Sequence, residues 1–149
     1  MKPARLLVCA LLAAMAAGSA QAVEFKSVGA DPVVAYDAPG AKGRKVFAVP
    51  RGMPVEPILT YGDWTKVRDS AGDLFWLESK NLTGKRTLVV KVANVKVRAS
   101  ADEASPPVFT ADKGVLLDLA EPPTSGWIRV KHRDGQSGYV KASEVWGAE

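Results

Sequence analysis

Beyond residue 22, short apolar runs alternate with turns that contain glycine, proline or aspartate. The runs at residues 46–49, 64–68 and 74–77 have the length and the valine, threonine and aromatic content of β-strands. Residues 69–73, which separate two of these runs, predict a hairpin loop. No stretch of this region keeps a helical period for ten residues, so the sequence predicts an all-β fold. Pro57 removes an amide donor from the run at residues 55–60, which predicts an edge strand or a β-bulge there.

The same pattern occurs twice along the chain, at an offset that drifts only from 61 to 63 residues. Residues 62–68 match residues 126–131 around Trp64 and Trp127, and residues 34–39 match residues 95–100. The latter match sets Tyr36 beside Val97. In both copies the residues after the tryptophan alternate towards a core, as Thr65 with Val67 and as Ile128 with Val130.

Each copy is about 60 residues long, too short for two full sheets but sufficient for a small closed barrel. The boundary falls near residues 83–87, which predicts one unit at 23–86 and a second at 87–149. A connection this short has little reach, so we expect the two barrels to touch.

The residues around each tryptophan carry a resemblance to a known family. Residues 62–68, followed by Gly72-Asp73 and residues 75–77, resemble a bacterial SH3 (SH3b) domain, and so do residues 126–130 with 134–140. The resemblance covers nearly all of the chain beyond residue 22. It implies two tandem SH3-like barrels that bind peptidoglycan, its stem peptides, or a partner protein of the cell envelope.

The first 22 residues have the composition of a secretory signal peptide. Lys2 and Arg5 precede an apolar run at residues 6–17, and small residues then lead to Ala22, after which we expect cleavage. The run is too short to span a bilayer. We therefore expect export, to a periplasm or alternatively by free secretion, with no membrane anchor in the mature chain.

Cleavage changes both the charge and the thiol content. The whole chain has 20 Lys and Arg against 16 Asp and Glu, and the mature chain would keep 18 against 16. A net charge of +2 spread over its length does not indicate a nucleic-acid partner. The single cysteine, Cys9, would leave with the signal peptide, which removes thiol chemistry and any cysteine-based metal site.

The remaining polar residues predict no catalytic group, metal or cofactor. His132, the single histidine, lies in the second hairpin loop, and Asp102 with Glu103 lies in a loop rich in alanine, serine and proline. Asp69 and Asp73 lack the further oxygen ligands of a calcium loop. The sequence favours a non-catalytic binding module. A structural protein that braces an envelope assembly is the alternative, and a cell-wall hydrolase is a third, weaker one.

The candidate ligand contacts are four aromatic residues and one acid: Tyr36, Tyr61, Trp64, Trp127 and Asp37. Residues 35–38 and Asp63-Trp64 are similar to two ligand-contacting segments of eukaryotic SH3 domains, although the proline and tyrosine that complete the groove in that family are missing. Stacking on tryptophan, with nearby basic residues meeting carboxylates, is the expected chemistry. The first copy has 10 Lys and Arg against 8 Asp and Glu, the second 8 against 8, which favours the first as the binding copy. The opposing interpretation is that the tryptophans only close the barrels.

Overall fold

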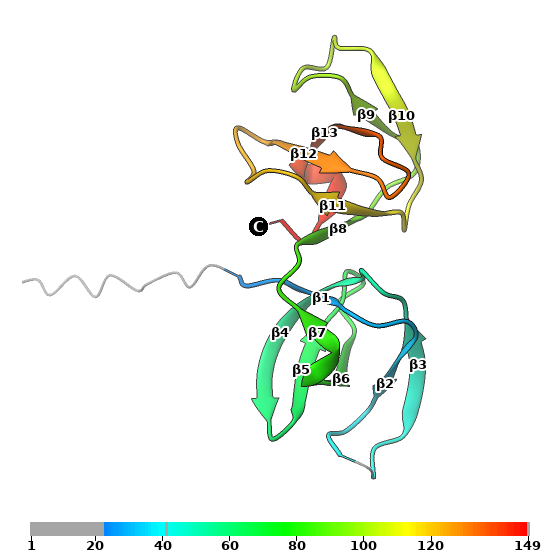
Figure 1. The fold of residues 1–149 in the computed structure, drawn as a ribbon, viewed down its shortest axis with the longest axis vertical. Helices are drawn as coiled ribbons and strands as arrows, with labels where there is room; N and C mark the ends of the chain where they lie inside the picture. Colours follow the sequence, from blue (N-terminus) through cyan, green and yellow to red (C-terminus); the bar gives the residue numbers. More distant parts are fainter. Residues whose placement is uncertain (1–22, 41, 149) are drawn as a thin grey trace, which may run out of the picture.

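The computed structural model describes residues 23–40 and 42–148, and the predicted signal peptide at 1–22 lies outside them. The described residues form two seven-stranded antiparallel sheets with the same strand order. Each sheet curls into its own barrel, and the two barrels lie one above the other in Figure 1. The predicted all-β fold of two tandem SH3-like barrels is therefore confirmed.

The first barrel has the strand order β3-β2-β6-β5-β4-β1-β7. Its elements are β1 (Lys26–Val28), β2 (Val33–Tyr36), β3 (Lys45–Val49), β4 (Pro54–Tyr61), β5 (Trp64–Arg68), β6 (Leu74–Glu78), the 3-10 turn η1 (Ser79–Asn81) and β7 (Leu82–Thr83). The predicted strand at 64–68 coincides with β5. The irregularity predicted at Pro57 is a β-bulge, because the pairing of β4 with β5 shifts register between Pro57 and Leu59.

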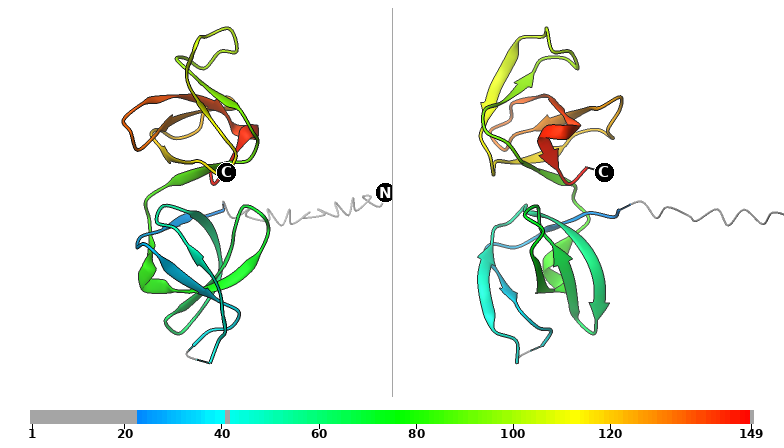
Figure 2. Two further views of the ribbon diagram at one scale, coloured as in Figure 1. Left: turned by 90° about the vertical axis from the view of Figure 1, so that its right-hand side faces the viewer. Right: turned by 180° about the vertical axis from the view of Figure 1, so that it is seen from behind.

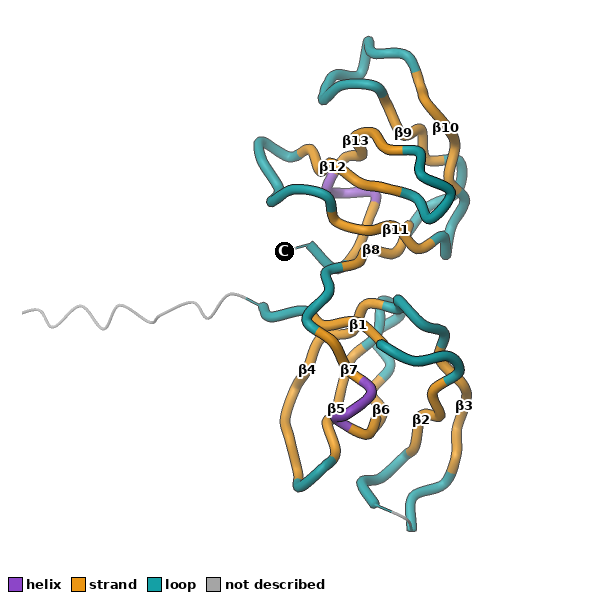
Figure 3. Tube along the Cα trace, viewed as in Figure 1, coloured by secondary structure: helices purple, strands orange, loops and turns teal. Residues whose placement is uncertain are grey.

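The second barrel repeats this order as β10-β9-β13-β12-β11-β8-β14. Its elements are β8 (Thr87–Val90), β9 (Val95–Arg98), β10 (Pro107–Ala111), β11 (Leu116–Leu119), β12 (Trp127–Lys131), β13 (Ser137–Lys141), the 3-10 turn η2 (Ala142–Glu144) and β14 (Val145–Trp146). Figure 3 shows that the helical turns are confined to these two short segments of the described chain. None of the helical segments described has the length and hydropathy needed to cross a membrane.

Each barrel closes around its own apolar core. The alternation predicted for the central strands is confirmed, since Thr65, Val67, Ile128 and Val130 are all buried. Full burial of an aliphatic side chain contributes about 1.5–3 kcal/mol, so these strands anchor both barrels. Phe75 belongs to the core of the first barrel and meets the half-exposed Phe47 edge-on, with ring centroids 4.8 Å apart.

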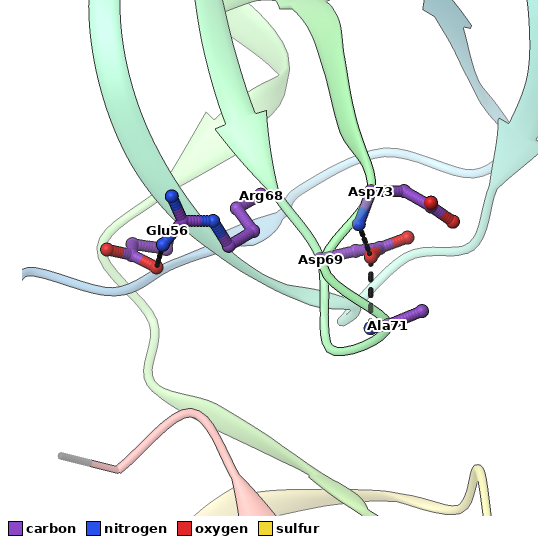
Figure 4. Close-up of polar contacts among 5 residues, drawn as sticks. All are labelled: Glu56, Arg68, Asp69, Ala71 and Asp73. Atoms are coloured by element: carbon purple, nitrogen blue, oxygen red, sulfur yellow. Dashed lines mark hydrogen bonds and ion pairs between the residues drawn. The ribbon is translucent and has the colours of Figure 1, made fainter.

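The predicted hairpin at residues 69–73 is confirmed by the pairing of β5 with β6. Asp69 holds this turn, because its Oδ1 accepts hydrogen bonds from the amides of Ala71 at 3.0 Å and Asp73 at 2.9 Å. Figure 4 shows these bonds beside the ion pair of Arg68 with Glu56, which joins β5 to β4 at 3.1 Å. The aspartate thus satisfies backbone donors, as is usual for aspartate in tight turns.

The two barrels contact one another, as the short connection predicts. Phe25, just before β1, is buried and packs edge-to-face on Trp146 of β14, with ring centroids 4.9 Å apart. The Arg86 guanidinium lies 5.6 Å from the centre of the Phe25 ring and donates a 2.9 Å hydrogen bond to the Gly147 carbonyl. Figure 2 shows from two further sides that the described ends of the chain, blue and red, meet at this junction.

Candidate functional site

A groove with a volume of about 520 Å³ opens on the first barrel, between the β2–β3 loop and the β4–β5 turn. The side chains that give it its chemistry are Tyr36, Lys45, Asp63, Trp64 and Glu78. Tyr36 ends β2 and Trp64 begins β5, so both lie where strands enter loops. The site therefore combines two aromatic rings with charges of both signs.

Tyr36 and Trp64 form the aromatic wall of this groove. Their rings meet edge-on, with centroids 5.1 Å apart and an angle of 89° between planes. Both residues are half-buried, so each ring packs partly in the barrel and partly lines the groove. Such a pair is worth about 0.5–1.5 kcal/mol beyond its buried area, which fixes the rings before any ligand arrives.

The turn before Trp64 is held in place from two sides. Gly62 adopts φ +57°, which favours glycine, and the Asp63 carbonyl accepts a 2.8 Å hydrogen bond from the amide of Ser79. The hydroxyls of Ser79 and Thr65 are 2.6 Å apart and hydrogen-bonded. These contacts tie the turn to η1 and leave the carboxylate of Asp63 at the groove.

Asp37 is placed beside the groove rather than in its lining. Its carboxylate accepts a 2.7 Å hydrogen bond from the Arg44 amide and a 3.0 Å one from the Arg44 guanidinium. The Arg44 amide, and then the guanidinium, lower the pKa of Asp37 below its ordinary value of 3.8. In this arrangement Asp37 closes the base of the β2–β3 loop, which carries groove residues.

The other two predicted contacts lie apart from this groove. Tyr61 pairs in register with Trp64 across the β4–β5 turn, yet its side chain is 68% exposed and does not line the groove. Trp127 lies in the second barrel, where it is half-buried. The structure thus brings together Tyr36 and Trp64 of the five predicted residues.

The groove also contains charged residues that were not among the ligand contacts predicted from the sequence. Glu78 lies opposite Trp64 in the β5–β6 ladder and is paired with Lys80 at 3.0 Å. Asp63 and Glu78 therefore face a single lysine of the lining, Lys45. The basic excess of the whole first copy does not extend to its groove. A hairpin centred on residues 69–73 could have revealed Glu78, because that register sets residue 78 against residue 64.

The second barrel has a different set of residues at the matching positions. In the ladders, Tyr36 lies opposite Trp76, whereas Arg98 lies opposite Tyr139. Arg98, not Val97, is therefore the structural counterpart of Tyr36, and the match made from sequence was wrong by one residue. Opposite Trp127 lies Lys141, which forms an ion pair with Glu103. The second copy thus replaces a tyrosine and a glutamate by two cations.

The polar residues that the sequence analysis considered for catalysis or metal binding do not line the groove. Within residues 23–40 and 42–148, no three histidine, cysteine, aspartate or glutamate side chains lie close enough to hold a metal ion. His132 packs its ring near Phe109, and its Nδ1 accepts a 3.3 Å hydrogen bond from the Asp134 amide. A carboxylate oxygen of Asp134 lies 3.0 Å from the same nitrogen, within the β12–β13 loop.

Comparison with known proteins identifies the family. The model of the bacterial SH3 domain matches the chain twice, over residues 29–84 and 91–147. The chain belongs to the bacterial SH3 family. Bacterial SH3 domains are binding modules, and this bacterial SH3 protein has two of them in tandem.

Two solved structures from one organism are similar to this chain at low sequence identity. NlpC2 from Trichomonas vaginalis is similar over 86% of this chain and 49% of its own, at 15% identity and a TM-score of 0.39. NlpC1 from the same organism is similar over 87% and 48%, at 15% identity and a TM-score of 0.38. The chain spans about half the length of these two proteins. No curated protein matches it.

Proposed function

We propose that this bacterial SH3 protein is a non-catalytic, exported binding protein whose first barrel binds peptidoglycan stem peptides in the Tyr36–Trp64 groove. The observation that carries the proposal is the preformed aromatic pair at the edge of an open groove. Aromatic faces bind sugar rings and peptide planes at little entropic cost, because the rings already have fixed orientations.

The charges of the groove refine the class of ligand. Glu78 is already paired with Lys80, so Asp63 is the acid that suits an ammonium group, whereas Lys45 suits a carboxylate. A short peptide that carries both an amine and a carboxylate would satisfy both signs at once. The groove therefore favours a zwitterionic stem peptide over a neutral glycan chain. The signal peptide proposed for residues 1–22 would deliver the protein to such a ligand in the periplasm.

A pull-down on purified sacculi tests this proposal. Trp64→Ala should weaken binding by about 1–3 kcal/mol, the usual range for an aromatic hot spot. Trp127→Ala is the matched control, because it truncates the same side chain at the equivalent position of the second barrel. If Trp64→Ala binds sacculi normally but melts much earlier than wild type, the ring only closes the barrel.

Asp63→Asn tests the charge argument separately. Asp63 is exposed, so its substitution should leave the melting temperature unchanged while binding to amine-bearing stem peptides falls. Stem peptides with acetylated amines should bind wild type and variant equally well. Equal binding of the free-amine peptide by both proteins would contradict an ammonium site at this aspartate.

An interaction protein that braces an envelope assembly is the second candidate. The first barrel exposes several large apolar side chains, each 40% or more accessible: Val46, Phe47, Ile58, Leu59 and Leu74. Where such side chains form a continuous patch, they mark a site of protein interaction. Capture of an envelope protein together with failure to bind sacculi would favour it. Loss of turbidity of a sacculus suspension would instead indicate a hydrolase.

A further inference from the structure

A second cavity, with a volume of about 550 Å³, lies between the two barrels and shares no lining residue with the groove. The β3–β4 turn of the first barrel forms one wall, and the β10–β11 and β12–β13 loops of the second form the other. Its charged lining consists of Arg51, Lys85, Lys131 and Arg133 against Asp31 and Asp118. The cavity is therefore cationic, and both barrels contribute to its charge.

Comparison of the two repeats shows how one of these cations becomes available. In the first barrel, Arg68 lies opposite Glu56 in the ladder and is neutralised by it at 3.1 Å. The equivalent pair in the second barrel is Lys131 opposite Asp118. There, however, Asp118 forms its ion pair with Lys85 of the connecting segment, at 3.3 Å.

Lys85 of the connecting segment thus pairs with Asp118, the acid that lies opposite Lys131 in the ladder. Among the residues that the structure describes, Lys131 forms no ion pair within 4.0 Å, and neither does Arg51 or Arg133. Asp31 is the one other acid of the lining, so the three cations leave an excess of positive charge that favours an anion between them. Two of the three are arginines, whose forked donors suit phosphate and carboxylate oxygens.

Contacts between the barrels fix the two walls of the cavity relative to one another. Phe25 packs on Trp146, Arg86 bonds the Gly147 carbonyl, and Gly52 beside Arg51 approaches Leu116 of β11. Because the two walls are already docked, a ligand does not have to bring the barrels together, which lowers the entropic cost of its capture.

We propose that the cavity between the barrels binds a multivalent anion bearing phosphate or carboxylate groups. Arg51 from the first barrel and Lys131 with Arg133 from the second bind the anion. Lys85 acts indirectly, by neutralising Asp118. The site is independent of the groove, so one protein can hold an anionic ligand and a peptide at the same time.

Isothermal titration of the purified protein with sodium tripolyphosphate and, separately, with citrate tests the proposal. The double variant Arg51→Gln/Arg133→Gln removes one cation from each barrel and should weaken binding by about tenfold or more. The control Lys42→Gln/Lys96→Gln makes the same change in net charge at exposed lysines outside the cavity and should bind as wild type.

The two titrants distinguish the sources of the anion. Tighter binding of tripolyphosphate indicates a phosphate ligand, and tighter binding of citrate a carboxylate one. No binding of either at low ionic strength, or equal weakening by both double variants, would overturn the proposal. Trp64→Ala should leave anion binding unchanged, which separates failure of this site from failure of the groove.

Discussion

Truncation of Phe25 should uncouple the two barrels. The ring is 3% exposed and packs on Trp146 of the second barrel and Arg86 of the connecting segment. Phe→Ala at a fully buried site costs about 3–5 kcal/mol. Phe25 precedes the first strand, where the chain can relax into the space left behind, so we expect the lower end, about 3 kcal/mol.

This loss falls on the docking of the barrels rather than on either core, because Phe25 belongs to neither core cluster. About 3 kcal/mol corresponds to roughly a hundredfold shift towards the undocked state. Nitrogen-15 relaxation measures the effect, since docked barrels tumble with one correlation time and undocked barrels with two shorter ones. Phe25→Ala should also weaken binding of the multivalent anion, although it removes no charge from the cavity.

Phe47→Ala is the matched control, because Phe47 packs on Phe75 within the first barrel and is 42% exposed. It should lower the stability of that barrel and leave the common tumbling intact. A Phe25→Ala variant that tumbles as one body, with an unchanged urea midpoint, would refute the idea that this ring couples the barrels.

Three further predictions concern single side chains. Trp127→Ala should lower the free energy of unfolding by about 2 kcal/mol, which is less than for a fully buried ring because Trp127 is half-buried. Binding of the variant to sacculi should persist. A thermal melt that matches wild type would contradict the expected loss of stability. Thr87→Val should raise the free energy of unfolding, measured by urea titration, by about 1 kcal/mol. The reason is that the Thr87 hydroxyl is buried with no hydrogen-bond partner among the described residues. A lower urea midpoint for the variant would show that the hydroxyl is hydrogen-bonded. Arg44→Gln should raise the pKa of Asp37 towards 3.8 but not fully, because the amide at residue 44 still donates. Because the pKa of Asp37 is lowered in the folded state, its contact with Arg44 stabilises the loop above pH 3.8, and this stabilisation is lost as the pH falls through the folded pKa. NMR titration of the Asp37 carboxyl group measures the change. An unchanged pKa in the Arg44→Gln variant would contradict the prediction.

The sequence was most informative where turn chemistry and alternation agree. Glycine and aspartate fix the β5–β6 hairpin, and once its loop is centred on residues 69–73 the whole ladder follows. The bulge in β4 was predictable for a similar reason, because proline cannot donate to its neighbour strand. These features depend on residues within a few positions of one another.

The one-residue error at Tyr36 has a physical cause. Val33, Val34 and Ala35 are all apolar, so alternation alone does not say which of them point into the core. The ladders settle the register, with Val33 and Ala35 buried in the first barrel and Val95 and Val97 in the second. Arg98 then occupies the place of Tyr36, which a pattern match cannot reveal.

The contacts between the barrels were beyond any local pattern. Phe25 and Trp146 lie near opposite ends of the described chain, and neither belongs to a periodic run that would mark it as buried. The short connection predicted that the barrels touch but not which surfaces meet. The pairing of Lys85 with Asp118 was hidden for the same reason, since it joins the connecting segment to a strand whose register was unknown.

The differences between the repeats argue for two roles rather than for one site used twice. Two equal sites would keep the same side chains at matching positions and gain avidity from bivalent binding. Here the first barrel has Tyr36 where the second has Arg98, so a ligand that stacks on the tyrosine ring of the groove would find no matching ring in the second barrel. Avidity for a single repeated ligand is therefore not what this tandem arrangement supplies. The tandem arrangement joins a first barrel that has an aromatic groove with acidic residues to a second barrel whose loops contribute cations to the cavity between them.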